Sequence, residues 1–178
     1  MFGFKKKKAE NLQEKFFQEH MDLFNPPSAF NGYEIVDDNK EKLTNICRIL
    51  TNNLVDIQKV SFENKYEFVD SLVELKYITE DFQQQYSLTE MVSGINEVAK
   101  KLNYNIKLTG EDVMQQDDDI KKQAREYFTY ITNHDLNVCA EIIEKQGYEL
   151  FQMFLDCGGF NMSILPKDKM EELKQYTN

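Results

Sequence analysis

The chain has 178 residues, with 41% hydrophobic and 12% aromatic side chains, and its formal net charge is −10. A chain of this length fits one domain with a substantial hydrophobic core, and its acidic charge argues against binding to nucleic-acid phosphates. The sequence contains neither the run of about 20 apolar residues that crosses a membrane nor an apolar secretion signal. We therefore expect a cytoplasmic protein.

The N-terminus is basic, with lysine at each position from 5 to 8. We expect residues 1–8 to form a flexible tail and residues 9–178 to form a single α+β domain. Such a short lysine run is at the lower limit of what binds anionic lipid. Regulation at a membrane surface through this tail is therefore an alternative function, although we do not expect membrane contact.

Hydrophobic residues at helical spacing predict helices through most of the chain. Asp38 and Glu41 have the spacing of a capping box, and Ser87 with Glu90 form a complete one. Residues 33–36 are a candidate short strand, and residues 105–108 are a candidate third strand beside a C-terminal hairpin, which would be marginal alone. The predicted helices before residue 132 cover residues 9–24, begin near residues 39, 61 and 87, and end with a fifth over 120–131.

The stretch from residue 136 to 176 organises the rest of the chain as helix, hairpin and helix. Gly147 ends the first helix, and alternating apolar residues then predict strands at about 148–157 and 160–165. Two glycines between them suit a tight hairpin turn. That turn would pair Cys157 with Phe160, Leu155 with Met162 and Met153 with Ile164 on one apolar face, and Asp156 with Asn161 on a half-exposed face. Pro166 would start the last helix.

The sequence offers little that points to catalysis. Its three cysteines, Cys47, Cys139 and Cys157, are widely spaced, and we expect buried free thiols rather than disulfides. Neither His20 nor His134 has further ligands at the spacing that zinc requires. No nucleophile elbow, phosphate-binding loop or dinucleotide motif occurs. We expect no metal or other cofactor, and we favour a protein without enzymatic activity.

An acidic stretch is the most conspicuous polar feature. Its carboxylates do not have the alternating spacing or the glycine of a calcium loop. They are consistent with favourable negative charge at a helix start, and also with a surface that steers a basic partner. The candidate partner-binding residues are Glu111, Asp112, Asp117, Asp118 and Asp119.

A second candidate site lies at the tip of the predicted hairpin. Asp156 and Asn161 would face each other there on a rigid ribbon. A polar pair at such a tip is usually solvated, but it is also where a catalytic or small-ligand site would be held in place. An enzyme or ligand-binding protein with a site around Asp156 is therefore an alternative function.

Several features resemble a family of bacterial proteins known only as a domain of unknown function. They are the helix ending at Gly147, the strand ending at Leu155-Asp156, the glycine-containing turn, Phe160, and the run from Leu165 to Leu173. The resemblance covers residues 62–176 and implies an α+β fold and a bacterial origin, without an established activity. In size and charge the chain is also similar to immunity proteins of bacterial toxin systems.

Together these observations predict an α+β domain with five to seven helices packed on a small antiparallel sheet. The function that we expect is a non-catalytic protein-interaction module, in the manner of an immunity-type inhibitor, whose acidic surface meets a basic protein. The sequence leaves the identity of that partner and the oligomeric state open.

Overall fold

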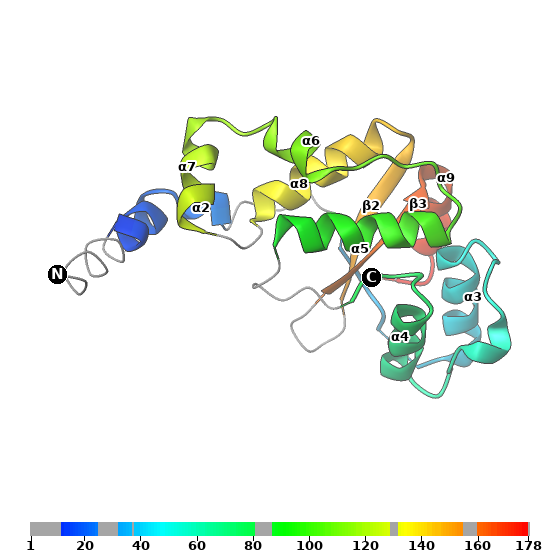
Figure 1. Ribbon diagram of the computed structural model, residues 1–178. Coiled ribbons are helices and arrows are strands. Elements are labelled where there is room, and N and C mark those ends of the chain that lie inside the picture. The colour runs from blue at the N-terminus through cyan, green and yellow to red at the C-terminus, as the bar shows by residue number, and fades with distance from the viewer. Residues whose placement is uncertain are drawn as a thin grey trace.

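A computed structural model describes residues 12–24, 32–36, 38–80, 87–128, 132–154 and 160–177. The fold is α+β, with helices around a small sheet of strand order β1-β2-β3 (Figure 1). The strands are β1 (Gly32–Glu34), β2 (Tyr148–Phe154) and β3 (Phe160–Pro166).

The sheet is mixed, because β2 pairs in parallel with β1 and antiparallel with β3. The expectation of an antiparallel sheet is therefore wrong. Its third strand is β1, near the candidate strand at 33–36, and residues 105–108 lie outside any strand. A parallel partner is possible because several helices separate β1 from β2 in the sequence, long enough to form a crossover connection.

The helices largely follow the predicted stretches. Residues 12–19 are helical, and the chain turns at His20 before α2. Short helices bring the count within the described residues above the five to seven expected. The helices with printed bounds are α2 (Met21–Phe24), α3 (Lys40–Leu50), the 3₁₀ helix η1 (Ile57–Lys59), α4 (Lys65–Glu74), α5 (Leu88–Lys101), α6 (Gly110–Met114), α7 (Asp119–Tyr127), α8 (Asn133–Glu144) and α9 (Lys167–Leu173).

Side-chain caps determine where several helices begin. Ser87 and Glu90 form the predicted capping box at the start of α5. At α3 the cap is Asn39, whose side chain accepts hydrogen bonds from two backbone N–H groups of the first turn. The predicted cap, Asp38, instead accepts a hydrogen bond from the backbone N–H of Lys65 at 2.6 Å. Asp38 therefore joins the starts of α3 and α4.

The hairpin is present, but its register differs from the predicted one. Met153 pairs with Asn161, whereas the prediction paired Met153 with Ile164 and Asn161 with Asp156. The other predicted pairs shift by the same three positions. The connection between the strands, residues 155–159, lies outside the described residues, as does the predicted turn at its glycines.

The register prediction failed because the hairpin is covered on both faces. Every residue of β3 from Met162 to Leu165 is at most 1% exposed, so the apolar set is not confined to one face. Register is specified strongly only where one face is buried and the other is solvated. A sequence pattern therefore could not choose between these two registers.

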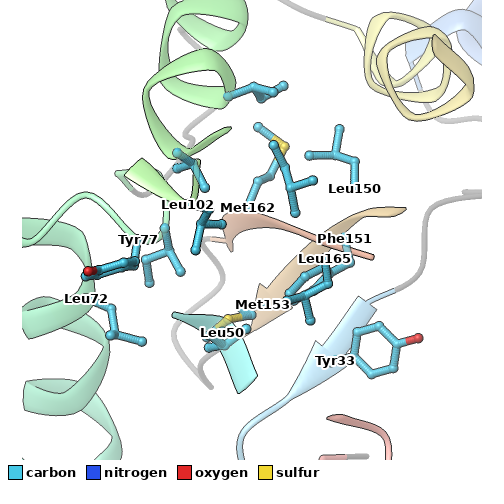
Figure 2. Packing of buried hydrophobic residues seen from close by; sticks show 14 of the residues in the cluster. Tyr33, Leu50, Leu72, Tyr77, Leu102, Leu150, Phe151, Met153, Met162 and Leu165 are labelled. Atoms are coloured by element: carbon cyan, nitrogen blue, oxygen red, sulfur yellow. The ribbon is translucent and has the colours of Figure 1, made fainter. Parts of the chain in front are cut away.

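The sheet is the middle layer of the fold (Figure 2). On one side, Leu150 and Met162 point toward Leu102 at the end of α5. The other side carries Phe151, Met153 and Leu165, which lie near Leu50 of α3 and Tyr33 of β1. Contacts of α8 with β2 and of α9 with β3 complete the two helical layers.

Residues 77–79 close the outer edge of β3 with polar contacts. Thr79 donates its backbone N–H to the Met162 carbonyl at 2.9 Å and accepts the Met162 N–H on its hydroxyl at 2.8 Å. Asn161 donates its side-chain amide to the Thr79 carbonyl at 2.8 Å, and the Ser163 hydroxyl donates to the Tyr77 carbonyl at 3.1 Å. These bonds satisfy an edge that would otherwise be open to pairing.

The N-terminal segment, residues 12–24, lies at the opposite end of the molecule from α3 and α4 (Figure 1). Its aromatic rings pack on the end of α7: Phe24 lies 5.0 Å and Phe17 lies 6.5 Å from the ring of Phe128. None of the helices in the described ranges combines the length and the apolar character that crossing a membrane would require.

Candidate functional site

Two carboxylates of the acidic stretch form side-chain caps at the starts of helices. Thr109 and Asp112 form a capping box at α6, in which the Asp112 carboxylate accepts the Thr109 N–H at 3.1 Å. Asp118 caps α7 by accepting the Lys121 N–H at 2.9 Å, and this hydrogen bond lowers the pKa of Asp118. The expectation of negative charge at a helix start is confirmed for α6 and α7.

Local cations offset much of the remaining charge of this stretch. Lys121 Nζ lies 3.8 Å from an Asp118 carboxylate oxygen, and Lys122 Nζ lies 3.8 Å from one of Asp119. Exposed pairs of this kind add little stability, but each reduces the charge that a partner would meet. Glu111 is exposed.

Asp117 is not part of an exposed acidic surface. Its side chain is 1% exposed and forms a two-point contact with the Arg125 guanidinium, at 2.5 Å to Nε and 3.0 Å to Nη2. The same Nη2 donates to Asp135 at 2.6 Å, and the Asp135 side chain is also 1% exposed. We name Asp117, Arg125 and Asp135 the buried ion triad.

Each member of the buried ion triad depends on the others. Burial alone would lower the pKa of Arg125, but hydrogen bonds and charge from Asp117 and Asp135 outweigh it, so the pKa is raised. Asp135 also completes a capping box with Thr132 at the start of α8. The triad thus connects α7 to the N-terminus of α8, which makes its role structural.

His134 lies beside the buried ion triad. Its Nε2 is 3.8 Å from an Asp117 carboxylate oxygen, and this buried nitrogen has no hydrogen-bond partner among the residues that the structure describes. Burial lowers the pKa of His134, and the positive charge of Lys121 lowers it further. The imidazole is therefore neutral at pH 7.

A cavity of about 20 Å³ adjoins this histidine. That volume has room for about one water molecule, so it does not accommodate an organic substrate. Its lining combines apolar side chains from α2 and α7 with polar residues of α7 and of the start of α8. The lining residues are Leu23, Lys121, Ala124, Arg125, Phe128, Thr132, His134 and Asp135.

A different acidic surface lies on α4. Glu67, Asp70 and Glu74 follow at helical spacing and are all exposed, on the side of the helix opposite its buried Phe68, Val69 and Leu72. No lysine or arginine in the described part of the chain forms an ion pair with these three carboxylates. We call Glu67, Asp70 and Glu74 the α4 acidic face.

Of the two residues of the predicted hairpin-tip site, the structure describes only Asn161. Asn161 is 6% exposed and its side-chain amide is bound to the Thr79 carbonyl. It pairs across the ladder with Met153. Asp156 lies outside the described residues. Asn161 thus holds the edge of the sheet, and its place there gives no support to a catalytic pair.

The buried thiols are poor nucleophiles. Burial raises the pKa of Cys47 to about 11 and that of Cys139 to about 12, and both are free. Because the thiolate is the reactive form, neither is reactive at neutral pH. Cys157 lies outside the described residues. Within the residues described, no three His, Cys, Asp or Glu side chains are grouped closely enough to hold a metal ion.

Two of these features escaped the sequence reading for different reasons. The buried ion triad joins positions that no sequence period relates, although Thr132 and Asp135 do have capping-box spacing. The α4 acidic face had a visible signal, because carboxylates at positions 67, 70 and 74 recur every three or four residues. The predicted binding surface was based on consecutive aspartates instead, although side chains that are neighbours in sequence point to different sides of a helix.

Comparison with models of protein families, with curated proteins and with solved structures finds no match to this chain. The resemblance to an uncharacterised bacterial family therefore stays an expectation based on residues 62–176.

Proposed function

We propose that the protein is a non-catalytic interaction module that binds a basic protein through an acidic surface, in the manner of an immunity-type inhibitor. The α4 acidic face is the observation that carries this proposal. It presents carboxylates in one row toward solvent, without ion pairs from the described part of the chain. Unscreened charge of this kind increases the rate at which an oppositely charged partner associates.

The acidic stretch remains the second candidate surface for the same function. Asp112 and Asp118 cap helices and Asp117 is buried, so Glu111 and Asp119 are the residues of this stretch whose carboxylates a partner could reach most easily. Asp119 also forms a surface ion pair with Lys122. The two surfaces therefore compete as explanations, and they can be tested against each other.

A matched pair of variants separates the two surfaces. Asp70→Asn with Glu74→Gln neutralises one aspartate and one glutamate on α4, and Asp119→Asn with Glu111→Gln does the same on the acidic stretch. All four side chains are exposed, so we expect both variants to fold. Circular dichroism and thermal unfolding would confirm this before any binding experiment.

The binding experiment has two stages. The tagged full-length chain first captures proteins from a lysate of its native host, and quantitative mass spectrometry identifies those enriched over a tag control. Binding of the purified basic candidate is then measured with each variant at 50 and 300 mM salt. We expect the α4 variant, which removes two charges, to weaken binding about fivefold to thirtyfold, as about 0.5–1 kcal/mol per exposed charge implies. Binding should weaken further at high salt.

The outcomes decide between the proposals. A complex weakened by the Asp119/Glu111 variant alone would assign binding to the acidic stretch. A complex that is insensitive to salt and to both variants would contradict the acidic-surface mechanism. The alternatives, an enzyme or ligand-binding site around Asp156 and membrane-surface regulation through residues 1–8, depend on residues outside the described ranges, and no described residue favours them.

A further inference from the structure

We propose that His134 makes the docking of the N-terminal segment sensitive to pH: proton uptake by its imidazole at mildly acidic pH loosens residues 12–24 from α7 and α8. This inference is independent of the proposed function, because none of the residues involved belongs to the α4 acidic face. It follows from the position of His134 between charged groups on one side and the N-terminal segment on the other.

Burial and two nearby cations oppose a positive charge on His134. Lys121 and Arg125 approach it from α7, and both are cations. The imidazole also occupies the first turn of α8, after the cap Thr132, where the positive end of the helix dipole disfavours a cation. The side chain is 18% exposed, and its Nε2 atom is buried, so water stabilises a charge there only weakly.

The carboxylates nearby do not reverse this balance. Asp117 and Asp135 attract a proton to His134, but both already bind Arg125, and Asp118 caps α7. An imidazolium is therefore more stable in open solvent than in this position. Proton uptake consequently favours any motion that exposes the imidazole.

The N-terminal segment is joined to the same position. Leu23 and His134 line one cavity. Asn133, the neighbour of His134, donates its side-chain amide to the Phe24 carbonyl at 3.0 Å. A second such bond, from the Gln13 amide to the Tyr127 carbonyl at 2.6 Å, holds the other end of the segment to α7. Motion at the start of α8 is thus transmitted directly to residues 12–24.

The direction of the effect follows from linkage. The folded-state pKa of His134 is lowered by burial. Undocking of residues 12–24 removes part of that burial and moves the pKa back toward the ordinary value of about 6.5, so the docked state binds fewer protons than the undocked state. Docking is at full strength above that ordinary value and weakens as the pH falls through the folded-state pKa.

Hydrogen–deuterium exchange of the full chain at pH 7.5 and 5.5 tests the proposal. After correction for intrinsic exchange rates, we expect the protection of residues 12–24 to fall by at least about threefold at pH 5.5. Protection of β3 serves as the internal reference and should not change. Equal protection of residues 12–24 at both pH values would overturn the proposal.

Two matched variants identify the titrating group. His134→Gln should abolish the pH dependence. His20→Gln should retain it, because His20 contacts a ring of the segment itself: the His20 and Phe16 ring centroids lie 4.6 Å apart in a tilted arrangement. The reverse result would overturn the proposal. An NMR titration of the two imidazoles in the unmodified chain provides a check that needs no variant: His134 must titrate below the ordinary histidine range, and a value within or above that range would refute the mechanism.

Discussion

The two ends of the molecule are held together by different physics. At the sheet end, α3, α5 and α9 pack on the strands through apolar side chains, many of them with no exposed surface. At the N-terminal end, aromatic rings of residues 12–24 pack on Phe128 at the end of α7, and the buried ion triad joins α7 to α8. Apolar burial is non-directional, whereas an ion triad depends on fixed geometry. A destabilising substitution at the sheet end should therefore affect the whole domain, whereas one at the N-terminal end should affect only its surroundings.

The largest expected effect comes from the sheet end. Phe151 has no exposed surface and its ring lies 5.7 Å from that of Tyr33. Phe151→Ala should lower the free energy of unfolding by about 3–5 kcal/mol, because it removes apolar burial and leaves a cavity. Urea unfolding monitored by circular dichroism measures this. The control Leu54→Ala, at a side chain 45% exposed, should cost less than about 0.5 kcal/mol, and equal losses would contradict the assignment of the core.

Arg125→Met tests the N-terminal end. It leaves the Asp117 and Asp135 carboxylates buried without their cation, and we expect a loss of about 3 kcal/mol. Hydrogen exchange should show the loss in residues 12–24, α7 and the start of α8, with β3 still protected. Adding Asp117→Asn and Asp135→Asn to Arg125→Met should recover part of the stability. A uniform loss of protection across the sheet would erase the contrast between the two ends.

The next largest loss of stability is expected from a polar contact within the sheet end. Thr79→Val keeps the shape of the side chain but removes the hydroxyl that accepts the Met162 N–H. A buried N–H without a partner costs about 1–2 kcal/mol, and this loss should appear in thermal unfolding. Thr79→Ser retains the hydroxyl and should be closer to the unmodified protein. If Ser and Val behave alike, the hydroxyl does not hold the edge of β3.

The smallest effect is expected at the aromatic contacts of the N-terminal end. Phe128→Leu keeps an apolar side chain but removes ring contacts with Phe17 and Phe24. Aromatic pairs add about 0.5–1.5 kcal/mol beyond their burial, so we expect a loss of about 1 kcal/mol. Hydrogen exchange that becomes faster only in residues 12–24 would show this loss. Unchanged exchange there would mean that the two side-chain amide bonds hold the segment by themselves.

The contrast between the two ends also explains how far the sequence could be interpreted. Helices with a regular apolar stripe, such as α3 and α5, were predicted close to their actual starts, and the fold class was correct. The mixed sheet was missed because β1 is only three residues long and its partner is distant in the sequence. The hairpin register was missed because covering helices on both faces removed the alternation that would have specified it.

The candidate sites show the same limit. Of the predicted acidic residues, Asp117 became buried against Arg125, while Asp112 and Asp118 cap helices. A run of charge in the sequence therefore gave a weaker surface than the spaced carboxylates of α4. At the predicted hairpin tip, Asn161 was instead assigned to the sheet edge by its bond to Thr79.

Local physics in the sequence was sufficient to determine where most helices start and end, that Gly147 closes α8 with a positive φ of 91°, and that two strands form a hairpin. Caps, glycines and hydrophobic periods act within a few residues of the chain, so the sequence displays them directly. The strand partners, the register and the buried ion triad were decided only by the tertiary structure. Each depends on which distant groups share a water-poor interior, where an unpaired charge or N–H is costly, and no local pattern contains that information.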